Sequence, residues 1–191
     1  NLAHGSLYLL GAYVGWIVGE QTGSWLLAVA AGFLSAAVLG LLLQVFIFRF
    51  MEGQDLRQTL VTIGLSIVLA DLMLWAFGGE IYTFDPPALI YGSTVLPVIE
   101  KFPTYRLFVL LVGVVVFVFL WFLINRTRLG ALIRAGVDDA ETVEAIGIDI
   151  KRVFVGTFML GAALAGVGGA LGGAFLSLYP TADSEILVFS L

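Results

Sequence analysis

The sequence predicts an all-α membrane protein, a polytopic bundle with about five to six transmembrane helices. Hydrophobic residues make up 60% of the 191 residues, charged residues only 12%, and the mean hydropathy is +1.05. Soluble domains carry charge on about a quarter of their residues, so this composition excludes a soluble domain. The apolar residues come in long runs, whereas a membrane barrel would show short alternating segments.

Five apolar stretches are near the length of about 20 residues that a helix needs to cross the hydrocarbon core of a membrane. They run from Leu2 to Val18, Trp25 to Phe48, Leu60 to Phe77, Leu107 to Ile124 and Phe154 to Leu178, and a sixth begins at Ile186. The chain starts at Asn1 without a methionine and stops inside the sixth stretch. We therefore expect residues 1–191 to form a single transmembrane domain that is an interior piece of a longer protein.

Basic residues set the expected orientation, because cytoplasmic loops are enriched in Lys and Arg. The connection at residues 125–152 contains Arg126, Arg128, Arg134, Lys151 and Arg152, and an earlier connection contains Arg49 and Arg57. The long connection between these two, residues 78–106, contains only Lys101 and Arg106. We predict that loop 125–152 is cytoplasmic and that loop 78–106, whose prolines exclude a continuous helix, is extracytoplasmic.

Loop 125–152 is patterned more strongly than a simple connection. Asp138 followed by Glu141 indicates a helix start, in which the Asp caps backbone N–H groups and both acids lie at the positive end of the helix dipole. Gly136 indicates a break before this helix, and Gly147 indicates its stop. A helix of about two turns is marginal alone in water, so this one is expected to lie against another surface.

Within this helix, Ala140, Val143 and Ile146 recur at helical spacing and predict one apolar stripe, while Glu141 and Glu144 face elsewhere. The stripe is the surface that we expect to dock. A plain connection between two spans is the alternative reading of the loop.

The order of residues in this loop resembles the cytoplasmic coupling segment of the branched-chain amino acid permeases. The resemblance covers Arg128-Leu-Gly-Ala, Arg134-Ala, Asp139, Ala145, Gly147-Ile148 and Arg152-Val153. These permeases are membrane subunits of ATP-binding-cassette importers, in which this loop docks on the ATPase subunit. The resemblance implies a coupling role for Arg134, Asp138, Asp139, Ala140, Glu141, Val143, Glu144, Ile146 and Gly147.

The opening Asn1-Leu2-Ala3-His4-Gly5 is similar to the Asn-Phe-Ala-His-Gly signature of the same family, with Leu2 in the aromatic position. At the start of an apolar run, such residues fit an interrupted helix whose free backbone groups can meet a polar substrate. The family resemblance covers essentially the whole chain. It implies that Asn1, His4 and Gly5 border the path of the solute.

Polar residues inside the apolar runs are the other candidates. Asp71 lies in the Leu60–Phe77 run, where a charge costs at least about 2.5 kcal/mol near the membrane centre and usually faces a cavity or partner. Thr62 and Ser66 precede it at i, i+4 spacing, so the three residues are predicted to form one loose polar face along the solute path. The alternative is that Asp71 reaches lipid headgroups. The family often has Gln at this position, so Asp71 departs from its pattern.

Small residues recur at every fourth position in three of the apolar runs. The sets are Gly11, Gly15, Gly19; Gly32, Ala36, Gly40; and Gly161, Ala165, Gly169, Gly173. Such stripes let helix backbones approach closely in a membrane, so they predict packing inside the bundle and indicate no particular function.

The family resemblance implies a permease subunit in the bacterial inner (plasma) membrane that moves a small polar solute. Its implied partners are cytoplasmic ATPase subunits, a second homologous permease subunit and an extracytoplasmic solute-binding protein. Branched-chain or other amino acids are the expected solutes, with urea or short amides as the alternative. An ion-coupled secondary transporter would need several buried ionisable groups, and only Asp71 and His4 qualify.

Several functions are not expected from the sequence. It has no phosphate loop, so ATP hydrolysis is expected on separate subunits. It also has no HExxH motif, no paired catalytic carboxylates and no Ser/His arrangement, so we predict no enzymatic activity. With no cysteine and one histidine, we expect neither a metal site nor a cofactor. Nothing in the sequence indicates a nucleic-acid partner.

Overall fold

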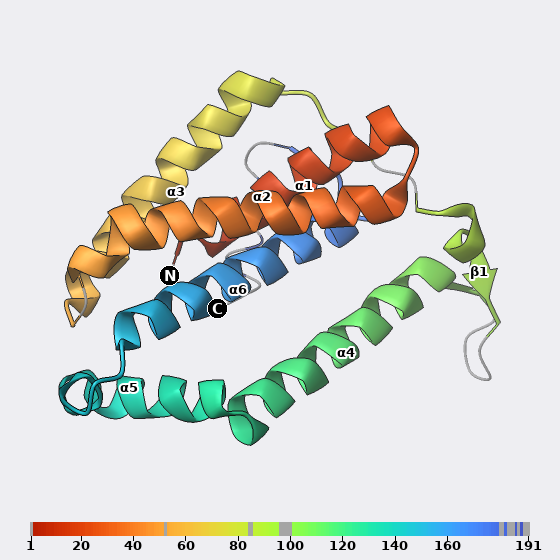
Figure 1. Ribbon diagram of the computed structural model, residues 1–191. Coiled ribbons are helices and arrows are strands. Elements are labelled where there is room, and N and C mark those ends of the chain that lie inside the picture. The colour runs from red at the N-terminus through yellow and green to blue at the C-terminus, as the bar shows by residue number, and fades with distance from the viewer. Residues whose placement is uncertain are drawn as a thin grey trace. The chain divides into compact units, whose positions relative to one another are not determined.

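A computed structural model describes residues 2–51, 53–83, 86–95, 101–179, 182, 186 and 188 (Figure 1). Its helices are α1 (His4–Thr22), α2 (Trp25–Phe46), α3 (Asp55–Phe77), α4 (Thr104–Arg126), α5 (Arg128–Ala145) and α6 (Ile150–Gly172). The short elements are the 3-10 helices η1 (Phe48–Met51) and η2 (Ala88–Ile90) and the strands β1 (Ser93–Thr94) and β2 (Phe102–Pro103). The predicted helical fold class is confirmed.

The chain forms two compact units. The first comprises Asn1–Asp85 and Val155–Leu191, and the second comprises Pro86–Phe154. The boundary falls inside α6, which begins in the second unit and continues into the first.

Four of the described helices are long and apolar enough to cross a membrane: α2, the Leu56–Phe77 part of α3, α4 and α6. The last predicted span is displaced. It was expected from Phe154 to Leu178, but α6 runs from Ile150 to Gly172. The reason lies in local chemistry, because the Asp149 side chain accepts a hydrogen bond from the Arg152 N–H at 3.2 Å and so caps the helix start. The predicted sixth span falls mostly outside the described residues.

The core of the first unit is a close contact of α1, α2 and α6, built on small residues. A Cβ atom added to Gly11 of α1 would overlap the backbone of Gly166 in α6, and one added to Gly166 would overlap the carbonyl oxygen of Gly32 in α2. Gly40 of α2 faces Ala162 of α6 in the same way. Helices without side chains at the contact gain van der Waals packing along their backbones, which is a main source of helix association in lipid.

The packing stripe of α6 differs in part from the predicted one, since Ala165, Gly169 and Gly173 are buried as expected but Gly161 is not. Gly161 is exposed, and a Cβ atom there would meet nothing within 4 Å. The residues that face α1 and α2 are Ala162, Gly166 and Ala170, which share i, i+4 spacing, together with Gly169 beside the Tyr8 carbonyl. The sequence offers small residues on two adjacent faces of this helix, so spacing alone could not separate them.

An aromatic cluster joins the end of α3 to α1 in the first unit. Tyr13 stacks on Phe77 with ring centroids 4.4 Å apart, and Tyr82 packs against Trp16 at 4.2 Å. The backbone of Tyr82 exchanges two hydrogen bonds with that of Leu178, at 3.0 and 2.9 Å. The segments that follow α3 and α6 are thereby tied together.

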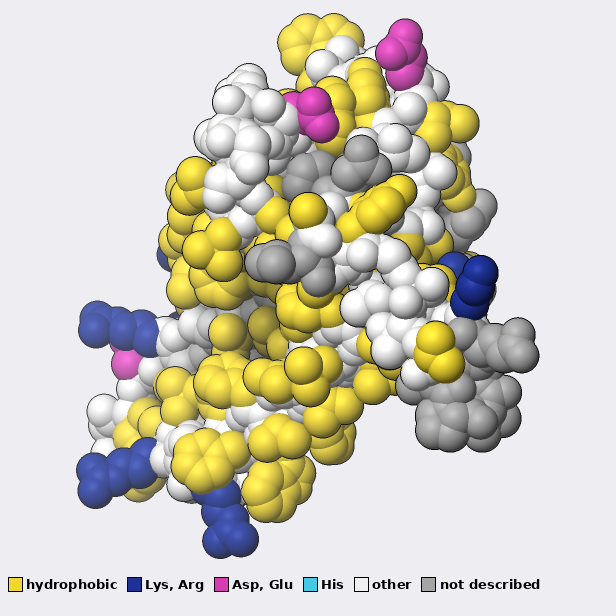
Figure 2. Space-filling view, turned by 90° about the vertical axis from the view of Figure 1, so that its right-hand side faces the viewer, with side chains coloured by type: hydrophobic (Ala, Val, Ile, Leu, Met, Phe, Trp, Pro, Cys, Tyr) yellow, Lys and Arg dark blue, Asp and Glu magenta, His cyan; other side chains and the backbone are white. Residues whose placement is uncertain are grey.

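The second unit contains η2, the β1–β2 hairpin, α4, α5 and the first residues of α6. Thr94 and Thr104 share a hydrogen bond of 2.9 Å beside the paired strands. In the described part of loop 78–106, helix is confined to the three residues of η2 and to residues 104–106, where α4 begins. The predicted absence of a continuous helix in those residues is confirmed. Figure 2 shows hydrophobic side chains over much of the face in view, with Lys and Arg side chains at its margins.

Candidate functional site

Loop 125–152 begins with a tight corner between α4 and α5. Thr127 is the N-cap of α5, where its hydroxyl accepts the Gly130 N–H at 3.1 Å and donates to the Leu123 carbonyl. The Arg134 guanidinium donates to the Ile124 carbonyl. These bonds satisfy carbonyl groups that the last turn of α4 would otherwise leave without partners. The structure therefore gives Arg134 a role in holding the corner.

The helix break in this loop lies at Asp139 and not at Gly136. Asp139 has φ −156° and ψ 91°, which divides α5 into two helical segments. Its carboxylate accepts the Thr142 N–H at 3.0 Å and also binds the Thr142 hydroxyl. Asp139 is therefore the N-cap of the second segment, and the predicted capping pair of Asp138 and Glu141 is wrong by one residue. The extended backbone needed at a cap position occurs at Asp139.

Gly136 has a packing role. The helix continues through it, and a Cβ atom there would come within 2.5 Å of Ile150 Cγ1 and 3.2 Å of Phe154 Cζ. Gly136 thus lets the start of α6 lie directly on the first segment of α5.

The predicted stop at Gly147 is confirmed. Gly147 has φ +88°, its N–H bonds to the Glu144 carbonyl at 2.9 Å, and the Ile148 N–H bonds to the Val143 carbonyl at 3.3 Å. This pair of bonds is the Schellman pattern, in which glycine takes the left-handed position after the helix end. Residues 140–146 are thus a short helix with a defined cap at each end.

The apolar stripe predicted for docking does not face outward as a whole. Val143 is only 6% exposed and Ala140 is half-buried, whereas Ile146 is 71% exposed. Val143 is therefore buried within the chain. The large apolar side chains that the loop leaves open are Ile146, Val137, which is 73% exposed, and Leu129, which is 43% exposed. Asp138, Glu141 and Glu144 are also exposed.

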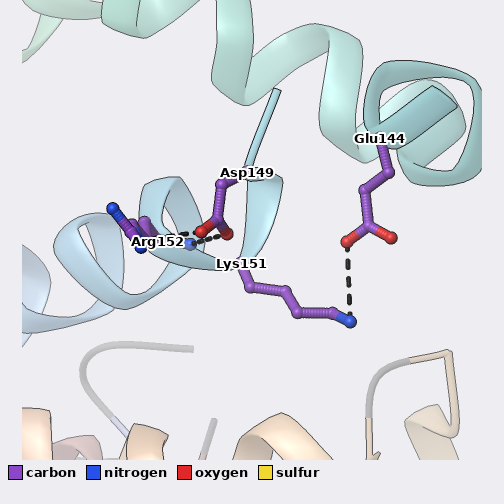
Figure 3. A network of polar contacts seen from close by, with 4 residues as sticks. All are labelled: Glu144, Asp149, Lys151 and Arg152. Carbon is purple, nitrogen blue, oxygen red and sulfur yellow. Dashed lines mark hydrogen bonds and ion pairs between the residues drawn. The ribbon is translucent and has the colours of Figure 1, made fainter. Parts of the chain in front are cut away.

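Two ion pairs lie at the junction of α5 and α6 (Figure 3). Arg152 Nε lies 2.7 Å from Asp149 Oδ2, and Lys151 Nζ lies 3.6 Å from Glu144 Oε1. All four side chains are substantially exposed, so each pair contributes at most about 1 kcal/mol. The Arg152–Asp149 pair lies at the first turn of α6, whereas the Lys151–Glu144 pair joins the second segment of α5 to α6.

The cap at Asp139 depends on pH. Hydrogen bonds from the hydroxyl and the backbone N–H of Thr142 hold the pKa of Asp139 below its ordinary value of 3.8. A depressed pKa in the folded state means that the cap is fully formed at neutral pH and weakens as pH falls through that lowered pKa.

We expect Asp139→Ala to raise hydrogen exchange at the amides of residues 140–146 severalfold at pH 7, because the Thr142 N–H loses its acceptor. Asp139→Asn is the matched control, since an Asn side chain can also cap a helix. It should keep slow exchange at pH 7 and should not show the loosening that the native chain shows in acid. Equal exchange in the alanine variant and the native chain would contradict the cap.

The polar residues predicted for the solute path fall on different sides of α3. Thr62 is fully buried and accepts the Leu2 N–H at 3.2 Å, next to the start of α1. The Ser6 hydroxyl donates to the Ser66 carbonyl at 3.5 Å. Thr62 therefore supplies a hydrogen-bond acceptor to the segment just before α1, whose N-cap Ala3 makes no side-chain cap bond. The structure thus brings the opening segment and the Thr62–Ser66 part of α3 together.

The remaining residues of the predicted path divide as follows. Gly5 is buried and His4 half-buried at the start of α1, and Asn1 lies outside the described residues. Asp71 is exposed and does not join Thr62, because about two and a half helical turns separate them and place them on opposite faces of α3. The single polar face predicted for these three residues is therefore wrong.

Several features were missed at the sequence level. Ser6 and Gln44 are buried polar residues in apolar runs, and Thr127 is the N-cap of α5. Threonine is a favoured N-cap residue, so its position shortly after an apolar run could have been read from the sequence. The backbone contact of Tyr82 with Leu178 joins segments that are far apart in the chain, so no local sequence pattern indicates it.

These features define a polytopic helical membrane protein with a folded loop between α4 and α6. A sequence profile described as "Branched-chain amino acid transport system / permease component" matches residues 1–189, and the chain belongs to this family. The high-affinity branched-chain amino acid transport system permease protein LivH of Escherichia coli is 31% identical over 191 residues, which cover 92% of this chain and 61% of LivH.

Other relatives are also permease proteins of high-affinity branched-chain amino acid transport systems. LivH of Salmonella typhimurium is 30% identical, with the same coverage of 92% and 61%, and BraD of Pseudomonas aeruginosa is 28% identical over 90% of this chain and 60% of its own length. The chain thus spans about three fifths of the relatives that it matches. No solved structure matches it.

Proposed function

We propose that this chain is the membrane-spanning part of a permease subunit in an ATP-binding-cassette importer of the bacterial inner membrane. Family membership supports this proposal, together with helices long and apolar enough to cross a membrane. The relatives are named as permease proteins of high-affinity branched-chain amino acid transport systems. We therefore propose amino acids as the solutes, carried to the permease by an extracytoplasmic binding protein.

The folded loop is the observation that carries the coupling role. A capped helix that displays Ile146 beside the exposed Glu141 and Glu144 suits insertion of the Ile146 side chain into an apolar pocket of a partner. We propose that the partner is a cytoplasmic ATPase subunit, and that a second permease subunit completes the membrane pathway. Movement of the ATPases would pass through residues 140–146 and the α5–α6 junction to the spans as a rigid-body rotation. This chain itself would hydrolyse no ATP.

Two alternatives have less support. Urea or short amides would fit a related permease of the same architecture, but the relatives named above concern branched-chain amino acids. An ion-coupled transporter would need several ionisable groups at membrane depth, and in the described spans Asp71 is the clearest such group.

The coupling role predicts a large effect of Ile146→Asp in the full-length permease assembled with its ATPases and binding protein. A charge placed in a desolvated contact is costly, so ATPase association and solute-stimulated ATP hydrolysis should fall at least about tenfold. Copurification of the ATPase and phosphate release measure the two effects. Because Ile146 is exposed, the variant should fold normally.

Ile81→Asp is the matched control, since Ile81 is 67% exposed and lies in the loop predicted to be extracytoplasmic. It should leave both quantities unchanged. Full association and full stimulated hydrolysis in the Ile146 variant would refute the docking role of this loop.

A further inference from the structure

One face of α3 is exposed and contains an ionisable residue inside an apolar span. We call it the Asp71 face, and its members are Leu60, Gly64, Ile67, Asp71 and Trp75. With 100° of rotation per residue, each of the five projects from the helix within about 40° of their mean direction. The opposite face of α3 is the one that packs on α1, through Thr62, Leu69 and Met73. Among the residues of the first unit that the structure describes, none packs on α1 from the Asp71 face, and all five members of that face are exposed.

Asp71 is too deep in its span to reach water along the helix. Residues Leu56–Phe77 form the span, so Asp71 lies about 9 Å along the axis from the Phe77 end. An Asp side chain is too short to cover that distance, unlike the long side chains of Lys and Arg. A carboxylate on a face turned to lipid would be unfavourable, so the Asp71 face must border protein or water.

No protein group in the described part of the chain neutralises Asp71. The ion pairs there involve other residues, and Arg57, the nearest basic residue along α3, is about four turns away. A second copy related by a two-fold axis along the membrane normal would bring its own Asp71 to the same depth. If the two Asp71 faces met, the copy would contribute a second carboxylate and no compensating cation, so it would not neutralise Asp71. Water and a cationic group of the solute are better occupants.

The neighbours of Asp71 suit a cation. Trp75 lies one turn further on the same face and is 85% exposed, and an indole ring attracts a cation that approaches its face. Gly64 lies about two turns in the other direction, and a Cβ atom there would meet nothing within 4 Å. The face thus offers a carboxylate and an aromatic ring next to open space near the middle of the span.

We propose that the Asp71 face borders the water-filled solute passage, and that Asp71 and Trp75 bind the ammonium group of an amino-acid solute there. This inference rests on the proposed transport function and adds the chemical group by which the passage selects its solutes. The passage admits solutes with an alkylammonium group and disfavours urea, amides and the hydroxy acids that share the same carbon skeleton.

Cysteine accessibility tests the passage without using transport as the readout. Residues 1–191 contain no cysteine, so Gly64→Cys, in a full-length permease whose remaining cysteines are replaced by serine, is a single reporter near the middle of the span in membranes. It should react with a cationic methanethiosulfonate about tenfold faster than with an anionic one. Adding Asp71→Asn should abolish that preference, and a saturating amino acid should slow the reaction.

Leu34→Cys is the matched control, because Leu34 is 59% exposed near the middle of α2 on an apolar face. It should not react. No reaction at Gly64→Cys would mean that lipid, a second subunit or another segment of the full-length permease covers the Asp71 face, and it would overturn the inference. Reaction with equal rates for the two reagents would overturn the role of Asp71.

Uptake measurements separate this inference from the proposed function. Asp71→Asn should raise the KM for the amino acid at least about tenfold, and Asp71→Glu should restore much of the loss. Unchanged KM in the Asn variant would overturn the ammonium site. If the native transporter moved no amino acid while Gly64→Cys still showed the Asp71-dependent preference, the proposed solute would be wrong and the cation-binding passage would stand.

Discussion

Gly166→Ala should clearly destabilise the folded protein, because Gly166 lies where α6 packs directly on the backbones of α1 and α2. A methyl group at this position would overlap the Gly32 carbonyl oxygen and come within 2.5 Å of Ala36 Cβ. The Gly32 oxygen is part of the α2 backbone and the Ala36 Cβ is bonded directly to it. Neither atom can move away unless α2 and α6 separate. Overpacking of this kind costs about 1–3 kcal/mol in well-packed cores. The midpoint of thermal unfolding in detergent should fall by several degrees, and the protease-resistant fraction should shrink.

Gly161→Ala provides the matched control on the same helix. Gly161 faces open space, so the same methyl group should leave the midpoint within about a degree of the native value or raise it slightly. Equal midpoints in the Gly166 and Gly161 variants would show that the α1–α2–α6 contact is not the core of the first unit.

Gly130→Ala should disconnect the loop from the spans, with uptake falling to background. An added Cβ atom would overlap the backbone carbonyl groups of Leu123 and Ile124, the same groups that Thr127 and Arg134 bind. The corner between α4 and α5 would have to open, and residues 140–146 would lose their fixed position. Limited proteolysis should then cut within residues 125–152 at least about tenfold faster.

Gly113→Ala, in the middle of α4, adds the same group where nothing lies within 4 Å. It should leave uptake and the proteolysis pattern unchanged. A native proteolysis pattern in the Gly130 variant would contradict the rigid corner and, with it, the transmission of movement through α5.

The sequence alone was sufficient for the fold class, because hydropathy reports burial in lipid independently of how helices pack. The ends of helices were less predictable. Asp138 and Asp139 are adjacent and equally suited to capping, and only the backbone at Asp139 adopts the extended conformation that a cap requires. Gly147 could be placed because a left-handed position after a helix strongly favours glycine.

The candidate sites were harder to predict than the helices. Periodicity shows that Val143 and Ile146 share a helical stripe, but it cannot show that α6 covers part of the loop and leaves Ile146 open. Thr62 and Asp71 are both polar residues in one apolar run, yet the position of α1 determines that Thr62 is buried and Asp71 is exposed. Both outcomes depend on contacts between residues far apart in the chain.

The central claim is that loop 125–152 docks on a cytoplasmic ATPase, and crosslinking from a single cysteine tests it most directly. Ile146→Cys in the otherwise cysteine-free sequence should form a crosslink with the ATPase subunit in membranes, with a yield that changes when ATP is added. Tyr91→Cys, in the loop predicted to be extracytoplasmic, should form none and should react with impermeant reagents from outside. A crosslink from Tyr91→Cys but not from Ile146→Cys would reverse the orientation and contradict the coupling role.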